Sequence, residues 1–525
     1  MFEKRPRIPR GRLVQLRNMN FARVFGAQPS LPAAHLVSVE ADIGRGLHAF
    51  SIVGLPDKAV EEARDRVASA IKNSGLTSPK STNKKIVISL APAELKKEGS
   101  AFDLPVALSY LLASDEFDFD PAGKLFAGEL ALDGTLRPVR GALSVALLAR
   151  EKGLRELFIP AENAEEASLV SGISIYPVRT LSDILMHLND TEEFALSAHI
   201  PAVASEEVYE SDVSLSDIRG QESAKRALEI AAAGRHNIAL YGPPGTGKTM
   251  LARAASALLP PLTEEEVLEV TAIHSLAGTT EGPVRRPPFR SPHHTSSYAS
   301  LIGGGTIPRP GEVTLAHRGL LFLDEFPEFH RDVVNALREP LEDAHVSVAR
   351  ARGSATFPAN FMLVAALNPC PCGKLGTRDC RCMPHVIEKY KRKISGPVAD
   401  RIDMWVQVGD MPPESLAIRK RQPDGQTATV RERVAKARAR QAQRFTGIKD
   451  VSTNADMGPK EIESLAELTS KAEDTLMHAA RQMKLSARGY HRTIKLARTI
   501  ADLLESDTIE PIHMLEALQY RQREL

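Results

Sequence analysis

The sequence predicts a multidomain α/β protein, and three observations support this fold class. The chain has 525 residues, which is too long for one hydrophobic core. Short β-branched runs, such as 85–89 and 157–159, alternate with helical patterns, such as 57–72 and 141–152. Further along, a glycine-rich string lies between an apolar strand pattern and a helical pattern, as in α/β nucleotide-binding folds.

Composition and periodicity divide the chain into six segments. Residues 1–19 are basic without an apolar stretch, which predicts a mobile start. Residues 189–215 are rich in Glu, Ser, Ala and Pro, which is typical of a linker. The predicted segments are a mobile N-terminus (1–19), an α/β domain (20–188), a linker (189–215), a second α/β domain (216–409), a loop with a basic helix (410–458) and a helical lid (459–525).

Charge, hydropathy and cysteine content limit the possible partners and the compartment. The formal net charge is +1, so any contact with nucleic acid must come from local basic patches. No apolar run approaches the roughly 18 residues that span a bilayer, so no membrane partner is expected. All four cysteines lie between Cys370 and Cys382, which favours a reducing cytoplasm over a secreted disulfide framework.

The most specific string predicts a phosphate-binding loop. It follows an apolar strand at 237–241 and opens a helix at 249–258. Glycines let backbone amides turn toward a phosphate, and the helix N-terminus adds its dipole. Lys248 is expected to reach the β- and γ-phosphates of ATP, and Thr249 to bind Mg²⁺. The residues of this loop are Gly242, Pro243, Pro244, Gly245, Thr246, Gly247, Lys248 and Thr249.

Two further strand ends carry polar residues suited to hydrolysis. The apolar strand at 319–323 ends in Asp324 and Glu325. We expect Asp324 to bind Mg²⁺ and Glu325 to activate the attacking water. A third strand at 361–366 leads to Asn368, whose amide would hold that water in line. An ordinary Asn-Pro turn is the alternative reading of Asn368.

With these strings in place, residues 216–525 resemble AAA+ ATPases of the magnesium-chelatase and MCM group. Nearly the whole chain resembles the bacterial ComM/YifB family, which is described as Mg-chelatase-like. The resemblance implies a hexameric DNA helicase that drives branch migration in recombination and natural transformation, with recombination proteins as possible partners. The strings that carry it, besides the phosphate loop, are 217–221, 289–295, 310–325, 368–373, 400–403 and 486–492.

The same resemblance assigns roles to arginines. Arg401 matches the arginine finger, which enters the ATP site of a neighbouring subunit and stabilises transition-state charge. An ion pair within the chain, with Asp400 or Asp403, is the alternative. Arg488 matches the sensor-2 arginine of the lid, and Arg492, one helical turn on, is the second candidate.

Two segments are candidates for contact with DNA. Residues 346–357 alternate and turn, which predicts a β-hairpin with Arg350 and Arg352 near its tip. The resemblance places such a hairpin in the pore of the ring; composition alone favours a solvated hairpin. Arg309 lies in a glycine-rich segment, 299–313, that matches the helix-2 insert. The basic helix at 430–444 is read equally as a DNA contact or as a solvated linker.

The cysteine cluster predicts a structural Zn²⁺ site, with four free thiols as the alternative. Cys370 and Cys372 form one pair, and Cys380 and Cys382 form the other. Four soft ligands suit a closed tetrahedral site, although each pair has one intervening residue rather than two. His385 is a spare ligand candidate, whereas the pair His293–His294 reads as a turn feature.

Residues 20–188 resemble the Lon-protease-like form of the ribosomal S5 domain-2 fold. Lon proteases use a Ser/Lys dyad, but here the serine position falls only near Ser100, and Leu143 stands where the lysine belongs. A serine without a base is a poor nucleophile, so proteolysis is not expected. A DNA-facing patch is an alternative role for Lys96, Lys97, Arg137 and Arg140, and an exposed structural surface without a DNA role is the other reading.

Three functions compete at this stage. The leading one is an ATP-driven DNA motor, as the resemblance implies. A metal-chelatase motor is the first rival, although the chain lacks an appended integrin-like domain. An ATP-dependent protein remodeller without protease activity is the second rival.

Overall fold

The structure is a computed structural model that describes most of the chain. The described residues are 20–30, 33–189, 195–200, 213–280, 282–304, 309–350, 353–375, 379–394, 396–409, 425–449 and 451–521. The predicted mobile start, most of the predicted linker and most of the predicted loop after 410 lie outside them. The chain divides into two compact units, Met1–Val203 with Ser275–Pro283, and Ala204–His274 with Val284–Leu525.

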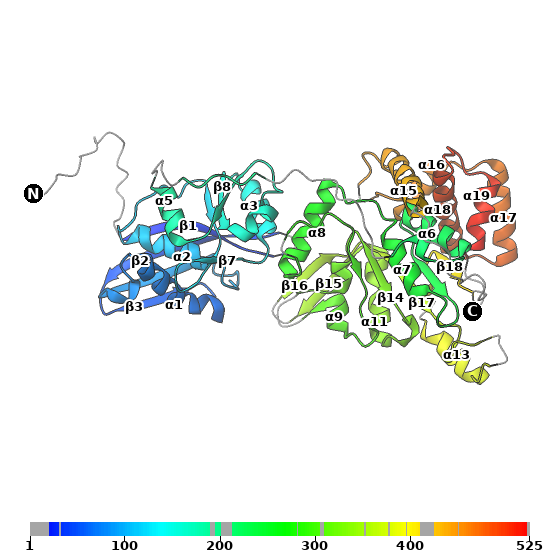
Figure 1. The fold of residues 1–525 in the computed structure, drawn as a ribbon, viewed down its shortest axis with the longest axis horizontal. Helices are drawn as coiled ribbons and strands as arrows, with labels where there is room; N and C mark the ends of the chain where they lie inside the picture. Colours follow the sequence, from blue (N-terminus) through cyan, green and yellow to red (C-terminus); the bar gives the residue numbers. More distant parts are fainter. Residues whose placement is uncertain are drawn as a thin grey trace, which may run out of the picture. The chain divides into compact units, whose positions relative to one another are not determined.

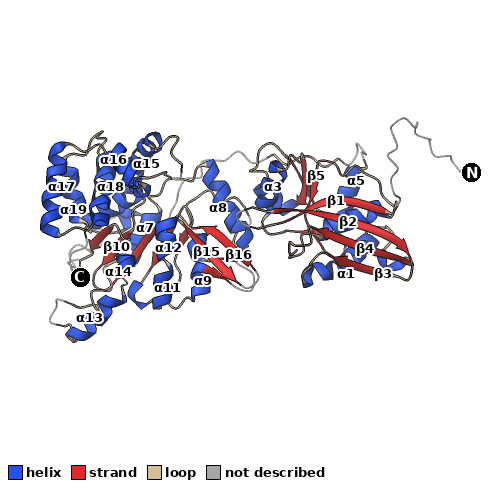
Figure 2. Cartoon of the chain, turned by 180° about the vertical axis from the view of Figure 1, so that it is seen from behind, coloured by secondary structure: helices blue, strands red, loops and turns tan. Residues whose placement is uncertain are grey.

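The first unit contains a four-stranded sheet in the order β1-β2-β4-β3, in which only the β3–β4 pair is parallel. Alternate residues of β1 and β2 are buried, as expected for a sheet with one face on a core. Figure 2 shows these strands with α1, and Figure 1 shows α2. The bounds are β1 Phe21–Gln28, β2 His35–Arg45, β3 Ala49–Val53, β4 Lys84–Ala91, α1 Lys58–Asn73 and α2 Asp103–Ala113.

A smaller parallel sheet, β5-β8-β9, completes the α/β pattern of this unit. The strand and helix patterns predicted in this part of the sequence are confirmed by β4, β8, α1 and α3. The remaining bounds are β5 Lys124–Phe126, β6 Glu129–Leu130, β7 Leu136–Arg137, β8 Glu156–Pro160, β9 Ser174–Val178, α3 Ala142–Glu151, α4 Ala164–Ala167 and α5 Leu181–Leu188.

The second unit is built on a five-stranded, all-parallel sheet in the order β11-β14-β17-β10-β18. Its central strands are fully apolar, as parallel strands covered on both faces must be. The bounds are β10 Ile238–Tyr241, β11 Phe289–Arg290, β14 Leu320–Leu323, β17 Met362–Leu367 and β18 Met404–Gln407, so the three strands predicted to carry the site are confirmed within two residues.

Helices and short strands around this sheet carry the loops of the site. Helix α6 contacts β18 and α7 contacts β17. The hairpin β15–β16 is antiparallel and confirms the predicted one (Figure 1). The bounds are α6 Glu222–Gly234, α7 Lys248–Ser256, α8 Glu264–Ala277, α9 Tyr298–Ile302, β12 Gly303–Gly304, β13 Arg309–Pro310, α10 Glu312–Leu315, α11 Arg331–Ala336, α12 Arg338–Asp343, β15 His345–Arg350, β16 Gly353–Pro358, α13 Pro384–Lys393 and α14 Gly396–Ala399.

The remaining described residues form the helix of the predicted segment 410–458 and the helices of the predicted lid 459–525, drawn in orange and red in Figure 1. Together they are called the lid below. Helices α15 and α18 pack against α6, and apolar side chains from all three helices enter one core. The bounds are α15 Gly425–Arg444, α16 Pro459–Leu465, α17 Ser470–Met483, α18 Ala487–Leu503 and α19 Pro511–Gln519. No helix among the described residues is long and apolar enough to cross a membrane.

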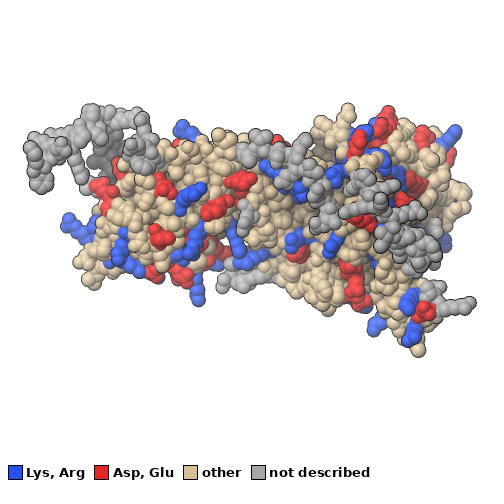
Figure 3. Space-filling model, in the orientation of Figure 1, with Lys and Arg blue, Asp and Glu red and all other residues tan. Residues whose placement is uncertain are grey.

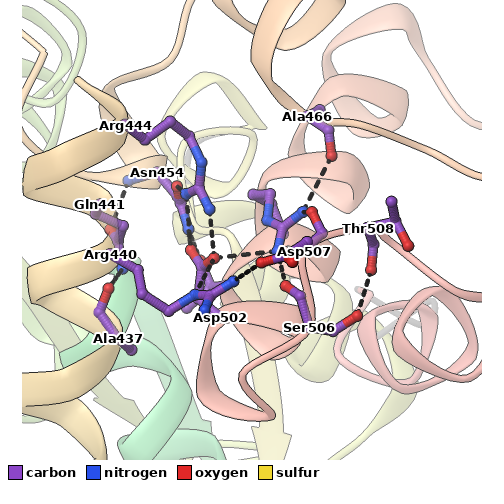
Figure 4. Close-up of polar contacts among 12 residues, drawn as sticks. Ala437, Arg440, Gln441, Arg444, Asn454, Ala466, Asp502, Ser506, Asp507 and Thr508 are labelled. Carbon is purple, nitrogen blue, oxygen red and sulfur yellow. Dashed lines mark hydrogen bonds and ion pairs between the residues drawn. The ribbon is translucent and has the colours of Figure 1, made fainter. Parts of the chain in front are cut away.

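A buried carboxylate, Asp502 of α18, ties the lid together (Figure 4). Its side chain is fully buried and accepts hydrogen bonds from Arg444, at 2.5 and 2.9 Å, and from Arg498, at 3.1 Å. Asn454 donates a further bond at 2.8 Å, and Arg440 lies 3.9 Å away. Two arginines of α15 are therefore held by an acid that lies far along the chain.

The other cations of α15 also have partners within the chain. Arg433 pairs with Glu229 of α6 at 2.6 Å, and Arg438 donates to the carbonyl of Ala232 at 2.8 Å. The solvated-linker reading does not hold for Arg438, because α6 supplies an acceptor that the local sequence does not show. Arg433 keeps 45% of its side chain exposed, so a DNA contact of this helix stays a prediction.

Candidate functional site

The phosphate-binding loop takes the shape that its sequence predicts. Gly245 and Gly247 have φ of +82° and +88°, in the left-handed region that favours glycine. Lys248 begins α7, is buried, and donates from Nζ to the carbonyls of Gly242 and Pro243, both at 2.7 Å. The same ammonium lies 3.2 Å from Oδ1 of Asn368. The loop, Lys248 and the end of β17 therefore meet at one point.

Two oxygen donors suited to Mg²⁺ lie side by side at the same edge. Oγ1 of Thr249 donates to Oδ2 of Asp324 at 3.0 Å, although 75 residues separate them. Hydroxyl and carboxylate oxygens are the ligands that Mg²⁺ prefers in phosphate sites, where it neutralises charge on the β- and γ-phosphates. The two predicted ligands fit the ion because parallel strands β10 and β14 end at the same edge of the sheet.

Glu325 follows Asp324 on a strained turn. Its φ is +50°, and its backbone N–H donates to Oδ1 of Asp324 at 2.9 Å. The two neighbouring carboxylates have different partners, Thr249 for Asp324 and His294 for Glu325, which suits one for a metal ion and the other for water. Oε2 of Glu325 lies 3.4 Å from Nδ1 of His294.

His294 is a residue that the sequence reading missed. Nδ1 of His293 contacts Oγ1 of Thr295 at 2.8 Å, as the predicted turn requires. Its neighbour, His294, instead reaches the carboxylate of Glu325. Nothing in the local sequence distinguishes the two imidazoles, because the contact depends on the loop after β11 lying beside the end of β14.

Arg401 and Arg488 lie together at the opposite edge of the sheet. Arg401 precedes β18 by three residues, so it stands at the amino ends of the parallel strands, whereas Lys248 and Asp324 stand at the carboxyl ends. Both guanidinium groups bond the same carboxylate, that of Glu342 on α12, and the Arg488 bond measures 3.0 Å. The predicted alternative for Arg401 is thus wrong in its partner, because the acid is neither Asp400 nor Asp403.

Arg492 has a different environment. Its Nε lies 3.4 Å from Oδ1 of Asp403, and its Nη1 donates to the carbonyl of Ile402 at 3.3 Å. Its side chain is 15% exposed, against 57% for Arg488. Arg492 therefore fastens the lid to the start of β18, and Arg488 is the more accessible of the two sensor candidates.

The three arginines proposed for DNA contact are only partly described. Arg309 is exposed and lies in β13, which pairs with β12. Arg350 ends β15, but its side chain lies outside the described residues, as does the whole of Arg352. Their role in DNA contact stays a prediction.

The four cysteines gather as the sequence predicts. Their Sγ atoms lie within 4.8 Å of one another, and the Sγ of Cys370 lies 3.4 Å from that of Cys372 and 3.9 Å from that of Cys380. A tetrahedral ion with Zn–S bonds of about 2.3 Å sets its ligands about 3.8 Å apart. Backbone amides of Lys374 and Arg381 lower the pKa of Cys372, whereas contacts with the neighbouring thiols raise the pKa of Cys380 and Cys382. The donor set thus fits Zn²⁺.

The cysteine loop also contacts the phosphate loop. A Cβ at Gly373 would lie 2.4 Å from Cδ of Pro244, and the φ of Gly373 is +74°. Only glycine fits both conditions. The segment that carries the cysteines therefore packs directly against the residues that would hold phosphate.

In the first unit, Ser100 has no lysine partner of the expected kind. Its hydroxyl donates to Glu129, and Leu143, at the position where a dyad lysine belongs, is fully buried. Of the proposed basic patch, Lys97 is buried and donates to the carbonyl of Pro92. The prediction of a DNA-facing patch is wrong for Lys97, whose ammonium points into the protein.

Comparison with known proteins agrees with this architecture. Residues 214–416 match the family described as "Magnesium chelatase, subunit ChlI", residues 39–163 match "Subunit ChlI of Mg-chelatase", and residues 424–521 match its C-terminal part. The first of these matches spans the whole parallel sheet and its loops, and the third spans the lid. The chain therefore has the ATPase core and lid of the chelatase-type AAA+ proteins.

Full-length similarity narrows the family. The chain is 44% identical over 508 residues to "Competence protein ComM" of Haemophilus influenzae, covering 96% of this chain and 98% of that protein. It is 43% identical over 492 residues to "Uncharacterized protein YifB" of Escherichia coli, covering 92% and 94%. "Lon protease 2" of Bacillus subtilis is 32% identical over 218 residues, covering 36% and 40%. The chain belongs to the ComM/YifB family of magnesium-chelatase-like AAA+ ATPases.

Proposed function

We propose that this protein is an ATP-driven DNA motor that works as a ring, with each ATP hydrolysed between two copies. The observation that carries the proposal is the separation of the site into two halves. Lys248, Asp324 and Glu325 lie at the carboxyl edge of the parallel sheet, and Arg401 and Arg488 lie at its amino edge. A second copy must supply the arginines, since one chain does not bring both halves together.

Within this proposal each polar group has one task. Lys248 holds the β- and γ-phosphates, and Thr249 and Asp324 bind Mg²⁺. Glu325 takes a proton from water that Asn368 keeps in line. Arg401 and Arg488 of the neighbouring copy offset the charge that develops on the γ-phosphate. The ring that follows from this division is a hexamer in the family that the chain resembles.

Two considerations support DNA as the substrate of the motor. The name of the Haemophilus influenzae relative links that protein to competence. Cations and anions are interspersed over the face drawn in Figure 3, so a DNA contact requires a local group of basic residues. The β15–β16 hairpin, with Arg350 and Arg352, and the strand that carries Arg309 supply one, because arginines bind phosphate without reading sequence.

Branch migration of a synthetic four-way junction tests the proposal. We expect junction DNA to raise the ATPase rate and Arg350→Ala/Arg352→Ala to abolish that rise. The slope of the logarithm of the DNA-binding constant against the logarithm of salt concentration should become shallower by about two, because two phosphate contacts are lost. A matched control, Lys471→Ala/Arg481→Ala, removes two exposed cations from α17 and should keep the rise. Stimulation by a protein partner alone would instead support a remodeller.

The cysteine cluster is proposed to hold one structural Zn²⁺ per chain. We expect atomic absorption to find about one equivalent of zinc, and Cys372→Ser/Cys380→Ser to lose it, because two of four ligands then disappear. His385→Ala is the control and should keep the metal, since the four sulfurs suffice. If protein expressed in zinc-supplemented medium contains no zinc after purification, the four cysteines are free thiols.

A further inference from the structure

One carboxylate, that of Glu342, lies between the two arginines proposed to act on a neighbour's ATP. It belongs to α12, which leads directly into the β15 strand of the hairpin. Oε1 accepts from Nη2 of Arg488 at 3.0 Å, and Oε2 accepts from Nη2 of Arg401. The two arginines come from positions 87 residues apart in the sequence, so this shared acceptor is what brings them to one place.

The surroundings of Glu342 carry an excess of positive charge. Arg338 begins α12, and Arg492 lies one turn beyond Arg488 on α18. Burial first, and then the like charges of Arg488 and Arg338, lower the pKa of Arg401. Without a carboxylate among them, the arginines would lower their energy by moving apart into solvent.

Arg401 keeps hydrogen-bond donors for another ligand while Glu342 holds it. Its Nη1 donates to the carbonyl of Pro397 at 2.6 Å and its Nη2 to Glu342, but its Nε is buried without a hydrogen-bond partner among the described residues. A guanidinium carries five N–H groups, so the two bonds to Pro397 and Glu342 leave further N–H groups of Arg401 unused. The contact with Glu342 therefore orients Arg401 without using all of its donors.

We propose that Glu342 is a positioning residue for ATP hydrolysis: its carboxylate holds Arg401 and Arg488 together as one unit for the nucleotide of the adjacent copy. The inference rests on the proposed function, in which both arginines act between copies. Oriented donors cost no rearrangement when charge develops on the γ-phosphate, so Glu342 affects kcat. It does not touch the nucleotide of its own chain, so the KM for ATP should stay the same.

The test is steady-state ATPase of the full chain carrying Glu342→Gln. This change keeps the shape of the side chain and removes its charge. We expect kcat to fall about five- to tenfold with KM for ATP unchanged, because Glu342 is half exposed and water screens part of its effect. Glu342→Asp keeps the charge and should retain more of the rate than Glu342→Gln. The matched control is Glu339→Gln on the same helix, which should keep the wild-type rate.

Mixing variants separates action on the neighbour from action within the chain. Lys248→Ala has an inactive ATP site but intact arginines, and Glu342→Gln has the reverse. We expect an equal mixture of the two to exceed the average rate of the separate variants. The mixture of Arg401→Ala with Lys248→Ala is the reference, because it tests the proposed function without Glu342.

The outcomes distinguish the two proposals. A gain in the Arg401 mixture and none in the Glu342 mixture would overturn the positioning role and leave the proposed function standing. No gain in either mixture would overturn the division of the site between copies, and the inference with it. A wild-type rate for Glu342→Gln alone would also overturn the positioning role, whatever the mixtures show.

Discussion

Glu325→Gln should bind ATP as tightly as the wild-type protein and hydrolyse it about 10²- to 10⁴-fold more slowly. The amide keeps the shape of the side chain, so the contacts of Lys248 with Gly242, Pro243 and Asn368 remain. It cannot accept the proton of the attacking water, which is the role assigned to Glu325. Binding of a fluorescent ATP analogue and single-turnover hydrolysis measure the two effects separately.

Two companion variants make this result specific. Lys248→Ala should abolish binding of the analogue, because the buried ammonium is the cation proposed to hold the β- and γ-phosphates. Glu328→Gln removes a carboxylate three residues beyond Glu325, where it pairs with Lys393 at 2.8 Å, and should hydrolyse ATP normally. Hydrolysis at the wild-type rate by Glu325→Gln would refute the role of Glu325 as the base.

Asp502→Asn should destabilise the lid by about 3–5 kcal/mol. The carboxylate is fully buried and faces three arginines, so its loss leaves positive charge without compensation in the protein interior. We therefore expect the midpoint of urea unfolding to shift to a lower urea concentration, as measured by circular dichroism at the helical band.

The control for this prediction is Asp507→Asn, in the loop after the same helix. Asp507 pairs with Arg440 at 2.5 Å, but its side chain is 88% exposed. Exposed pairs contribute about 0–1 kcal/mol, so the midpoint should barely move. Equal midpoints for Asp502→Asn and the wild-type protein would show that the arginines find other acceptors.

The sequence predicted the elements whose signals are local. The apolar strands before Gly242, Asp324 and Asn368 lie where the residue pattern placed them, because a buried parallel strand must be apolar throughout. The start of α15 was placed five residues too late. Gly425 and Thr427 are weak helix formers, but Thr427 is buried and accepts a hydrogen bond from the amide of Leu215 at 3.0 Å, which holds the first turn in place.

What the sequence did not reveal are contacts between residues far apart in the chain. His294 reaches Glu325, Arg433 reaches Glu229, and Glu342 collects Arg401 and Arg488. In each case one partner looked like an ordinary polar residue in a loop or on a helix surface. Charge pairing between segments depends on the packing of the sheet and lid, and no residue pattern within either segment encodes it.

The position of the two half-sites at opposite ends of parallel strands also constrains symmetry. In the proposed motor, contact between copies joins unlike surfaces, head to tail, so a twofold-symmetric dimer would leave every nucleotide without its arginines. A head-to-tail contact either closes on itself or continues as a filament. Closure then makes each copy both a donor and an acceptor, so that a chain defective in one half-site impairs one junction and a chain defective in both half-sites impairs two.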